Sequence, residues 1–267
     1  FRLGMYREAL ADYTKVLEVE SSNAEAWHNR GATYLRLGEF DKAIADLSKA
    51  IGLKIKITGT YALRADAFES LGKYNEALAD LEEVIRQNST NAAAYHNKGK
   101  ILAQLGRLEE ALLSFTYAIE IDSNNVESLL SRGGILARLK IYEEALRDLT
   151  KAINLEPNNP HALNNRGLVY IALNMHQEAI SDLKKVTEIE PENIIALAFI
   201  GHAFFSMGDN TNATEYYQNA LKKVGSKSAN LRNSEDYFAA IKAERGLKSL
   251  GIDVGNRYEK ESMERGI

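Results

Sequence analysis

Four arginines of this chain recur at a fixed distance from an aspartate. Each pair is separated by sixteen residues: Arg30 and Asp46, Arg64 and Asp80, Arg132 and Asp148, Arg166 and Asp182. A guanidinium can engage a carboxylate through two parallel hydrogen bonds while its aliphatic stem packs on apolar neighbours. The series is interrupted twice, where Lys98 precedes Ser114 and Ile200 precedes Tyr216. We therefore predict four structural Arg–Asp pairs; the alternative is a ladder of arginines that binds an acidic partner.

The residues that usually build catalytic and metal centres form no such pattern. The sequence has no cysteine, no His-Glu-x-x-His motif and no Gly-rich phosphate loop. Structural zinc sites draw mainly on Cys and His, and thiol chemistry needs Cys. We therefore predict a protein that is not an enzyme and that holds no cofactor and no metal.

A self-similarity with a period of 34 residues positions all of these side chains. The blocks begin at Ala24, Thr58, Ala92, Val126, Pro160 and Ile194. One column of the aligned blocks is small: Gly31, Ala65, Gly99, Gly133, Gly167 and Gly201. A second column is alanine throughout: Ala43, Ala77, Ala111, Ala145, Ala179 and Ala213. A fixed period of this size is typical of stacked supersecondary units rather than of one globular core.

Each block is predicted to form two helices joined by a short turn. Apolar or small residues recur three and four positions apart in two runs, which places them on one face of a helix. Between the runs stands a glycine suited to end a helix in the left-handed region: Gly38, Gly72, Gly106 or Gly208. Asn174 can adopt that conformation, whereas Lys140 is a poor fit. The period also keeps His28 and His96 two blocks, about 16 Å or more, apart, which is too far to share a metal.

With these columns the chain resembles the tetratricopeptide repeat family. The aromatic or Leu column of that family is present as Trp27, Tyr61, Tyr95, Leu129, Leu163 and Leu197. The proline that closes family blocks remains as Pro157 and Pro191. The resemblance implies an all-α fold, a right-handed superhelical solenoid of antiparallel helix pairs. Its concave groove is expected to bind a peptide or protein.

The register of the repeats predicts the organisation of the whole chain. Six full repeats are expected at residues 24–57, 58–91, 92–125, 126–159, 160–193 and 194–227, after the second helix of a truncated repeat at 1–23. Residues 228–250 are predicted to contain an amphipathic capping helix, which a solenoid needs at its end. Its two sides are Tyr237, Phe238, Ile241 and Leu247 against Lys242, Glu244, Arg245 and Lys248. The charged tail 251–267 is expected to be loosely ordered, and the start inside a repeat is typical of a fragment.

The resemblance assigns the groove lining to the first helix of each repeat. The polar residues expected there are His28, Asn29, His96, Asn97, Lys100, Ser131 and Asn165, and His161 and His202 also fall on groove-facing positions. An asparagine side chain is both donor and acceptor. Asn29, Asn97 and Asn165 form a row similar to those with which family relatives hold the amides of an extended peptide. The alternative is that they are merely tolerated polar residues on helices.

The C-terminal end of the expected groove is apolar. Its predicted lining is Leu168, Ile171, Ile195, Phe199, His202 and Phe205. An exposed apolar patch of this kind usually marks a binding site, and we expect it to accept one or two large side chains. The alternative is that the C-terminal segment covers the patch, since a helix that is apolar all round is normally buried.

Composition and position narrow the class of partner. A net charge of −4 provides no basic field for nucleic acid and no polybasic patch for a membrane surface. No apolar run reaches the ~18 residues of a membrane span. The family's clamp for acidic chaperone tails needs Lys and Asn where His28 and Ala32 stand, and no other repeat has both, so this partner is disfavoured. The absence of cysteine fits a cytosolic protein.

The leading functional prediction is a non-catalytic protein–protein interaction scaffold that holds a peptide or protein segment in its concave groove. One alternative is self-assembly into a homo-oligomer through the truncated end or the apolar patch. Another is a targeting module cut from a larger multidomain protein. The identity of the partner does not follow from these residues.

Overall fold

A computed structural model describes residues 2–55, 57, 59–227, 234–252, 254 and 258. Within this part of the chain the structure consists of fourteen α-helices and contains no strand. The fold divides into two compact units, Phe1–Ser128 and Leu129–Ile267, and each is described separately. The predicted all-α fold is therefore confirmed.

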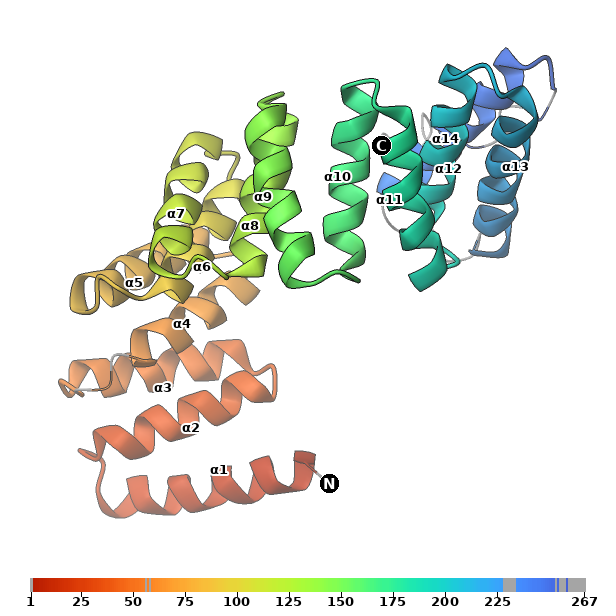
Figure 1. The fold of residues 1–267 in the computed structure, drawn as a ribbon. Helices are drawn as coiled ribbons and strands as arrows, with labels where there is room; N and C mark the ends of the chain where they lie inside the picture. The colour runs from red at the N-terminus through yellow and green to blue at the C-terminus, as the bar shows by residue number, and fades with distance from the viewer. Residues whose placement is uncertain are drawn as a thin grey trace. The chain divides into compact units, whose positions relative to one another are not determined.

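Consecutive helices pack against one another within each unit, as Figure 1 shows. The first unit holds α1 (Arg2–Val19), α2 (Ala24–Arg36), α3 (Phe40–Gly52), α4 (Gly59–Ser70), α5 (Tyr74–Gln87), α6 (Ala92–Gln104) and α7 (Leu108–Ile121). The boundary falls within α8 (Val126–Arg138). The second unit continues with α9 (Tyr142–Leu155), α10 (Pro160–Ala172), α11 (His176–Ile189), α12 (Ile194–Ser206), α13 (Asn210–Lys227) and α14 (Ser234–Ser249). We refer to α2, α4, α6, α8, α10 and α12 as the A helices and to their successors as the B helices.

Asparagine caps begin most of the A helices, a signal that the repeat alignment contains but that our sequence reading did not use. The side-chain oxygens of Asn23, Asn91, Asn159 and Asn193 accept from the backbone N–H three residues on, at 2.9 to 3.1 Å. Such a cap satisfies one of the free donors in the first helical turn. Ile57 cannot cap, and the helix that follows it, α4, begins only at Gly59.

The turns between A and B helices use the left-handed region, as predicted. Gly38, Gly72, Gly106 and Gly208 have φ angles of 71° to 79°. Lys140 and Asn174 adopt the same conformation with φ angles of 62° and 59°. The repeat geometry therefore imposes this backbone even on a lysine, whose Cβ makes it unfavourable.

The small columns allow the two helices of a pair to approach closely. A Cβ added to Gly167 would lie 2.8 Å from Cγ of Leu183 on the facing B helix. A Cβ added to Gly201 would lie 2.8 Å from the ring of Tyr217. The alanine column on the B helices is fully buried: Ala43, Ala77, Ala111, Ala145, Ala179 and Ala213.

The last helix, α14, packs against both α12 and α13. Tyr217 of α13, which is 1% exposed, lies between Gly201 of α12 and Gly246 of α14. A Cβ on Gly246 would come within 2.3 Å of the Tyr217 ring, so this site accepts only glycine without movement. The register of α14 on the second unit is thus set by shape.

Several details differ from the predicted cap. Phe238 was expected on the apolar side but is 61% exposed, and Glu244 was expected on the polar side but is 1% exposed. The carboxylate of Glu244 accepts the backbone N–H of Tyr258 at 3.1 Å. Tyr258 belongs to the core that α12, α13 and α14 share, and Ile252 and Val254 pack against that core. Residues 228–233 and the Tyr237 side chain lie outside the described part of the chain.

Candidate functional site

The four predicted Arg–Asp pairs form, and each is bidentate. In the first unit Arg30 donates from Nε and Nη2 to Asp46 at 2.6 and 2.9 Å, and Arg64 donates likewise to Asp80 at 2.8 and 2.6 Å. In the second unit the distances are 2.7 and 2.8 Å from Arg132 to Asp148, and 2.7 and 2.9 Å from Arg166 to Asp182. The four carboxylates are 5 to 8% exposed. Because each guanidinium is already engaged by a buried carboxylate, the arginines do not form a ladder for an acidic ligand.

Arg30, Arg64 and Arg166 also reach back to the helix that precedes their own. The remaining Nη1 of Arg30, Arg64 and Arg166 donates to a hydroxyl sixteen residues earlier, on Thr14, Ser48 or Thr150. One guanidinium therefore ties together three successive helices. Lys98, in the interrupted repeat, bonds only backward, to Glu82 at 2.9 Å, while Ser114 donates to the carbonyl of Glu110. The compact ammonium of lysine cannot form the fork that arginine provides.

Two histidines that were predicted to line the groove, His28 and His96, make hydrogen bonds within the chain. Nδ1 of His28 lies 2.9 Å from the hydroxyl of Thr60, and Nδ1 of His96 lies 2.9 Å from the hydroxyl of Ser128. Both hydroxyl residues are fully buried, and each pair joins one A helix to the next. Burial lowers the pKa of both histidines. His28 and His96 therefore form contacts between repeats. His161, also predicted to face the groove, is exposed on α10.

The same ladder is left incomplete in the second unit. Asn164 occupies the position of His28 and His96 in its repeat, but the residue that corresponds to Thr60 is Ala196, which has no hydroxyl. The Asn164 Oδ1 atom is buried and has no hydrogen-bond partner among the described residues. Sequence reasoning overlooked Asn164 because the groove assignment emphasised its neighbour Asn165.

The row of groove asparagines is placed differently from the histidines. Asn29 is exposed on α2, Asn97 is half-buried on α6, and Asn165 is half-buried on α10. Among the described contacts none of their side-chain amides makes a hydrogen bond within the chain. Ser131, in the same column, is half-buried on α8. The donors and acceptors of these amides are therefore unused within the described part of the chain.

A charged cluster lies beside this row in the first unit. Lys100 on α6 pairs with Glu69 on α4 at 3.0 Å. Asp66, one turn before Glu69, is solvent-exposed, yet desolvation by the surrounding protein and the charge of Glu69 raise its pKa. The A helices α4 and α6 of this unit thus carry a mixed-charge cluster of Asp66, Glu69 and Lys100.

The apolar end of the predicted groove is partly covered by α14. Ile195 and Phe205 pack on the core that α12, α13 and α14 share, and Ala198 is fully buried. The Phe199 ring has the ammonium of Lys242 of α14 at 4.8 Å from its centroid. Leu168 and Ile171 on α10 stay half-buried. The alternative that the C-terminal segment covers this patch therefore applies to part of it.

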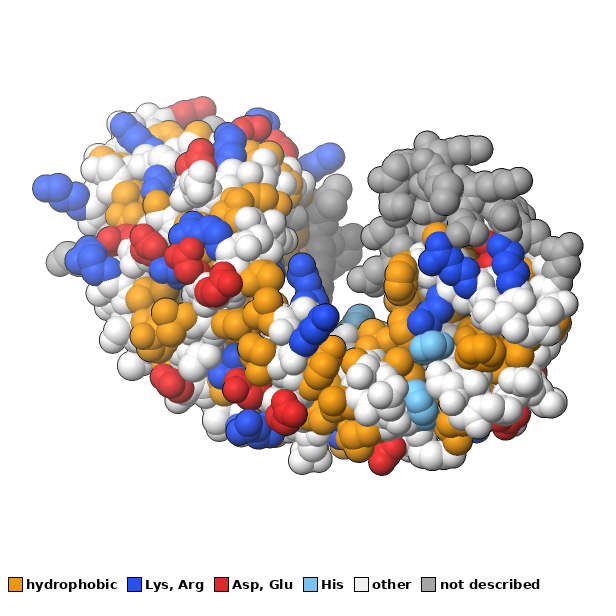
Figure 2. Space-filling model, turned by 90° about the horizontal axis from the view of Figure 1, so that it is seen from above, with side chains coloured by type: hydrophobic (Ala, Val, Ile, Leu, Met, Phe, Trp, Pro, Cys, Tyr) orange, Lys and Arg blue, Asp and Glu red, His pale blue; other side chains and the backbone are white. Residues whose placement is uncertain are grey.

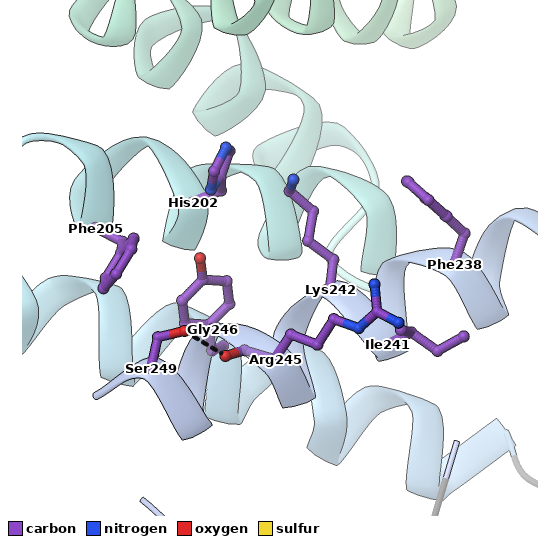
Figure 3. A pocket seen from close by; sticks show the side chains of 9 residues that line it. His202, Phe205, Phe238, Ile241, Lys242, Arg245, Gly246 and Ser249 are labelled. Atoms are coloured by element: carbon purple, nitrogen blue, oxygen red, sulfur yellow. Dashed lines mark hydrogen bonds between the residues drawn. The ribbon is translucent and has the colours of Figure 1, made fainter. Parts of the chain in front are cut away.

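An open pocket of about 260 Å³ remains between α12 and α14. Figure 3 shows His202 and Phe205 on α12 across from Phe238, Lys242 and Arg245 on α14. Its other lining residues are Tyr217, Ile241, Gly246 and Ser249. Burial lowers the pKa of His202 to about 4, together with the electrostatic effects of Lys242 and His176. Burial also lowers the pKa of Lys242. In Figure 2 basic and histidine side chains gather beside hydrophobic ones over the C-terminal helices.

A metal site and a membrane span each require features that the described residues do not combine. No group of three or more His, Asp or Glu side chains that could hold a metal comes together there. None of the helices in that part combines the length and the apolar character that a membrane span requires.

Paired helices stacked in register, with Gly and Ala columns at their contacts, define a helical repeat protein. The chain belongs to the tetratricopeptide repeat family. Models described as tetratricopeptide repeat match residues 24–54, 63–126, 160–193 and 195–222, and a model described as TPR repeat matches 1–38 and 135–174. A search of curated proteins finds no match.

Solved structures of similar fold come from several sources. A MamA structure from Desulfovibrio magneticus is 22% identical with a TM-score of 0.61, covering 64% of this chain and 96% of that one. YrrB, described as a TPR protein with an unusual peptide-binding site, is 24% identical with a TM-score of 0.60, covering 69% and 95%. Part of a TPR repeat-containing protein from Cytophaga hutchinsonii is 20% identical with a TM-score of 0.66, covering 86% and 97%. At these identities the likeness establishes the fold alone.

Proposed function

We propose that this chain is a non-catalytic interaction scaffold that holds an extended peptide or protein segment along its A helices. The observation that carries the proposal is the contrast between two neighbouring columns. The offset occupied by His28 and His96 is used for bonds between repeats. The next column, with Asn29, Asn97 and Asn165, makes no hydrogen bond among the described contacts.

Unbonded amides suit the backbone of a peptide. Each asparagine side chain offers a donor and an acceptor, which match the C=O and N–H of an extended strand. Such bonds are independent of the side chains of the ligand, so they provide affinity and leave specificity to other contacts. The mixed charges of Asp66, Glu69 and Lys100 and the pocket at α12 are candidates for those other contacts. YrrB, of similar fold, is described as having a peptide-binding site, which adds support by analogy.

The test is selection of binding peptides from a displayed library, followed by affinity measurement on variants. Asn97→Ala should weaken a selected peptide about fivefold, because one hydrogen bond is worth ~1 kcal/mol. Asn75→Ala, an exposed asparagine on the B helix α5, is the matched control and should change nothing. Peptides whose affinity is unaffected by Asn29→Ala, Asn97→Ala and Asn165→Ala alike would remove the asparagine row from the binding surface.

A second candidate is pairing between copies of the chain through α1. This helix exposes Met5, Val16 and Val19, at 59%, 41% and 92%. Light scattering over a range of concentrations measures the mass, and Val19→Glu should reduce any association. A constant monomer mass would eliminate this candidate.

A further inference from the structure

The pocket between α12 and α14 has a basic lining, although the chain as a whole is acidic. The whole molecule is acidic, with a net charge of −4, yet no carboxylate is among the residues that line this pocket. Its rim carries Lys242 and Arg245 of α14 and the imidazole of His202 of α12. Glu244 of α14 is buried and accepts the backbone N–H of Tyr258.

Lys242 is the cation best placed to meet a ligand. Its described contact is with a ring, since Nζ lies 4.8 Å from the centroid of Phe199. No described ion pair includes it, and burial lowers its pKa. A partly desolvated ammonium gains most from an opposite charge, because water screens that attraction less than it does on an open surface. The site therefore favours an anionic group.

The remaining lining favours a large apolar group next to that anion. Phe205 and Ile241 are half-buried, and Phe238 is 61% exposed at the rim. Large aromatic side chains left open at the edge of a pocket are typical anchors for a bound side chain. The floor is the buried ring of Tyr217, whose position is set by Gly201 and Gly246.

The pocket also lies where a held segment would pass. It opens beside α12, the A helix whose Phe199 occupies the same column as Asn29, Asn97 and Asn165. A peptide that runs along the A helices of the second unit would thus pass Phe199, whose ring is contacted by Lys242 of the pocket lining.

We propose that this pocket receives an acidic side chain adjacent to a large apolar one in the bound segment, with the carboxylate against Lys242 and the apolar group against Phe205 and Phe238. The inference rests on the proposed function, since it names the chemistry of the segment that the scaffold holds. It concerns α14, which lies outside the A-helix positions of the family's chaperone-tail clamp.

The experiment uses two dipeptide probes that differ only in charge, N-acetyl-aspartyl-phenylalaninamide and N-acetyl-asparaginyl-phenylalaninamide. Each is titrated into the isotope-labelled full chain, and backbone amide shifts are followed by NMR. The acidic probe should shift signals of α12 and α14 around the pocket. The neutral isostere should bind about tenfold more weakly or worse, the loss expected for one charge-assisted hydrogen bond. A third probe, N-acetylphenylalanine, distinguishes a terminal carboxylate: tighter binding than the aspartyl probe would overturn the assignment to a side chain.

Two variants assign the effect to the pocket. Lys242→Gln should reduce the affinity for the acidic probe to that for its neutral isostere. Lys222→Gln, which removes the same charge from an exposed position on α13, should leave both affinities unchanged. Equal affinity for the two probes, shifts confined to α1–α7, or an unaltered Lys242→Gln titration would each overturn the proposal. Asn97→Ala should leave these titrations unaffected, so failure of the asparagine row and failure of the pocket are distinguishable.

Discussion

At the scale of single residues, the Arg–Asp pairs decide how the repeats are held together. The pairs of Arg30, Arg64 and Arg166 combine a bidentate ion pair with a guanidinium that lies near an aromatic ring. The guanidinium of Arg30 is 4.7 Å from the Trp27 ring centroid, and that of Arg64 is 5.6 Å from the Phe68 ring centroid. The hydrogen bond to Asp46 raises the pKa of Arg30, partly opposed by burial. Arginine is therefore required at this position, because a planar guanidinium can donate two parallel hydrogen bonds to one carboxylate and a lysine ammonium cannot.

The strength of one such pair can be measured by a double-mutant cycle on Arg166 and Asp182. Asp182→Leu leaves a partly buried guanidinium without its carboxylate and should lower the free energy of unfolding by about 2–4 kcal/mol. Arg166→Met leaves the buried Asp182 carboxylate without its guanidinium and should lower the free energy of unfolding by a similar amount. The double variant should cost less than the sum, with a coupling of about 1–3 kcal/mol in chemical denaturation.

The exposed pair Arg107–Glu110 provides the control for that cycle. Its side chains are 46% and 56% exposed, and its coupling should be much smaller and should vanish at high salt. Additive effects of the two substitutions at Arg166 and Asp182 would contradict the structural role of the pair.

At the scale of helices, the turn between A and B helices imposes one backbone conformation on different residues. Four repeats use glycine, while Asn174 and Lys140 adopt the left-handed region with a side chain. The cost falls on the lysine, because its Cβ approaches the following carbonyl oxygen. The turn after α8 is thus a point of local strain in an otherwise regular series.

Lys140→Gly should stabilise the protein by about 0.5–1 kcal/mol, since the relief of strain exceeds the added entropy of the unfolded chain. The midpoint of urea unfolding should rise. Gly106→Lys is the reverse substitution at φ 76°, where an added Cβ meets nothing within 4 Å, and it should lower the midpoint by a similar amount. A Lys140→Gly protein that is no more stable than the parent would show that the lysine pays no conformational penalty in this turn.

At the scale of the whole molecule, half-buried histidines link stability to pH. Burial lowers the pKa of His28 and His96, and burial with Lys242 lowers that of His202 to about 4. The unfolded pKa is near 6.5. A histidine whose folded pKa is depressed contributes stability that is fully present above pH ~6.5 and is lost as pH falls toward the folded pKa.

The urea midpoint should therefore be lower at pH 5 than at pH 7. His202→Gln should reduce the difference, because the glutamine binds no proton in either state. Lys242→Gln should raise the pKa of His202, measured by NMR titration of its imidazole signals. A midpoint that is the same at both pH values would contradict the burial of these three rings.

The sequence by itself determined what is local or periodic. The 34-residue columns predict the helix pairs, the left-handed turns and the four Arg–Asp contacts, because residues sixteen apart in a helix–turn–helix unit face each other in every repeat. The Asn caps stood in the same alignment and were readable by the same logic. Tertiary structure alone decided contacts that depend on how units meet, such as His28 with Thr60 and the incomplete position at Asn164. It also decided that α14 lies on α12, buries Glu244, exposes Phe238 and brings Lys242 to Phe199. A capping helix lies outside the repeat, so no column constrains it, and its place follows from the fit of Gly246 on Tyr217.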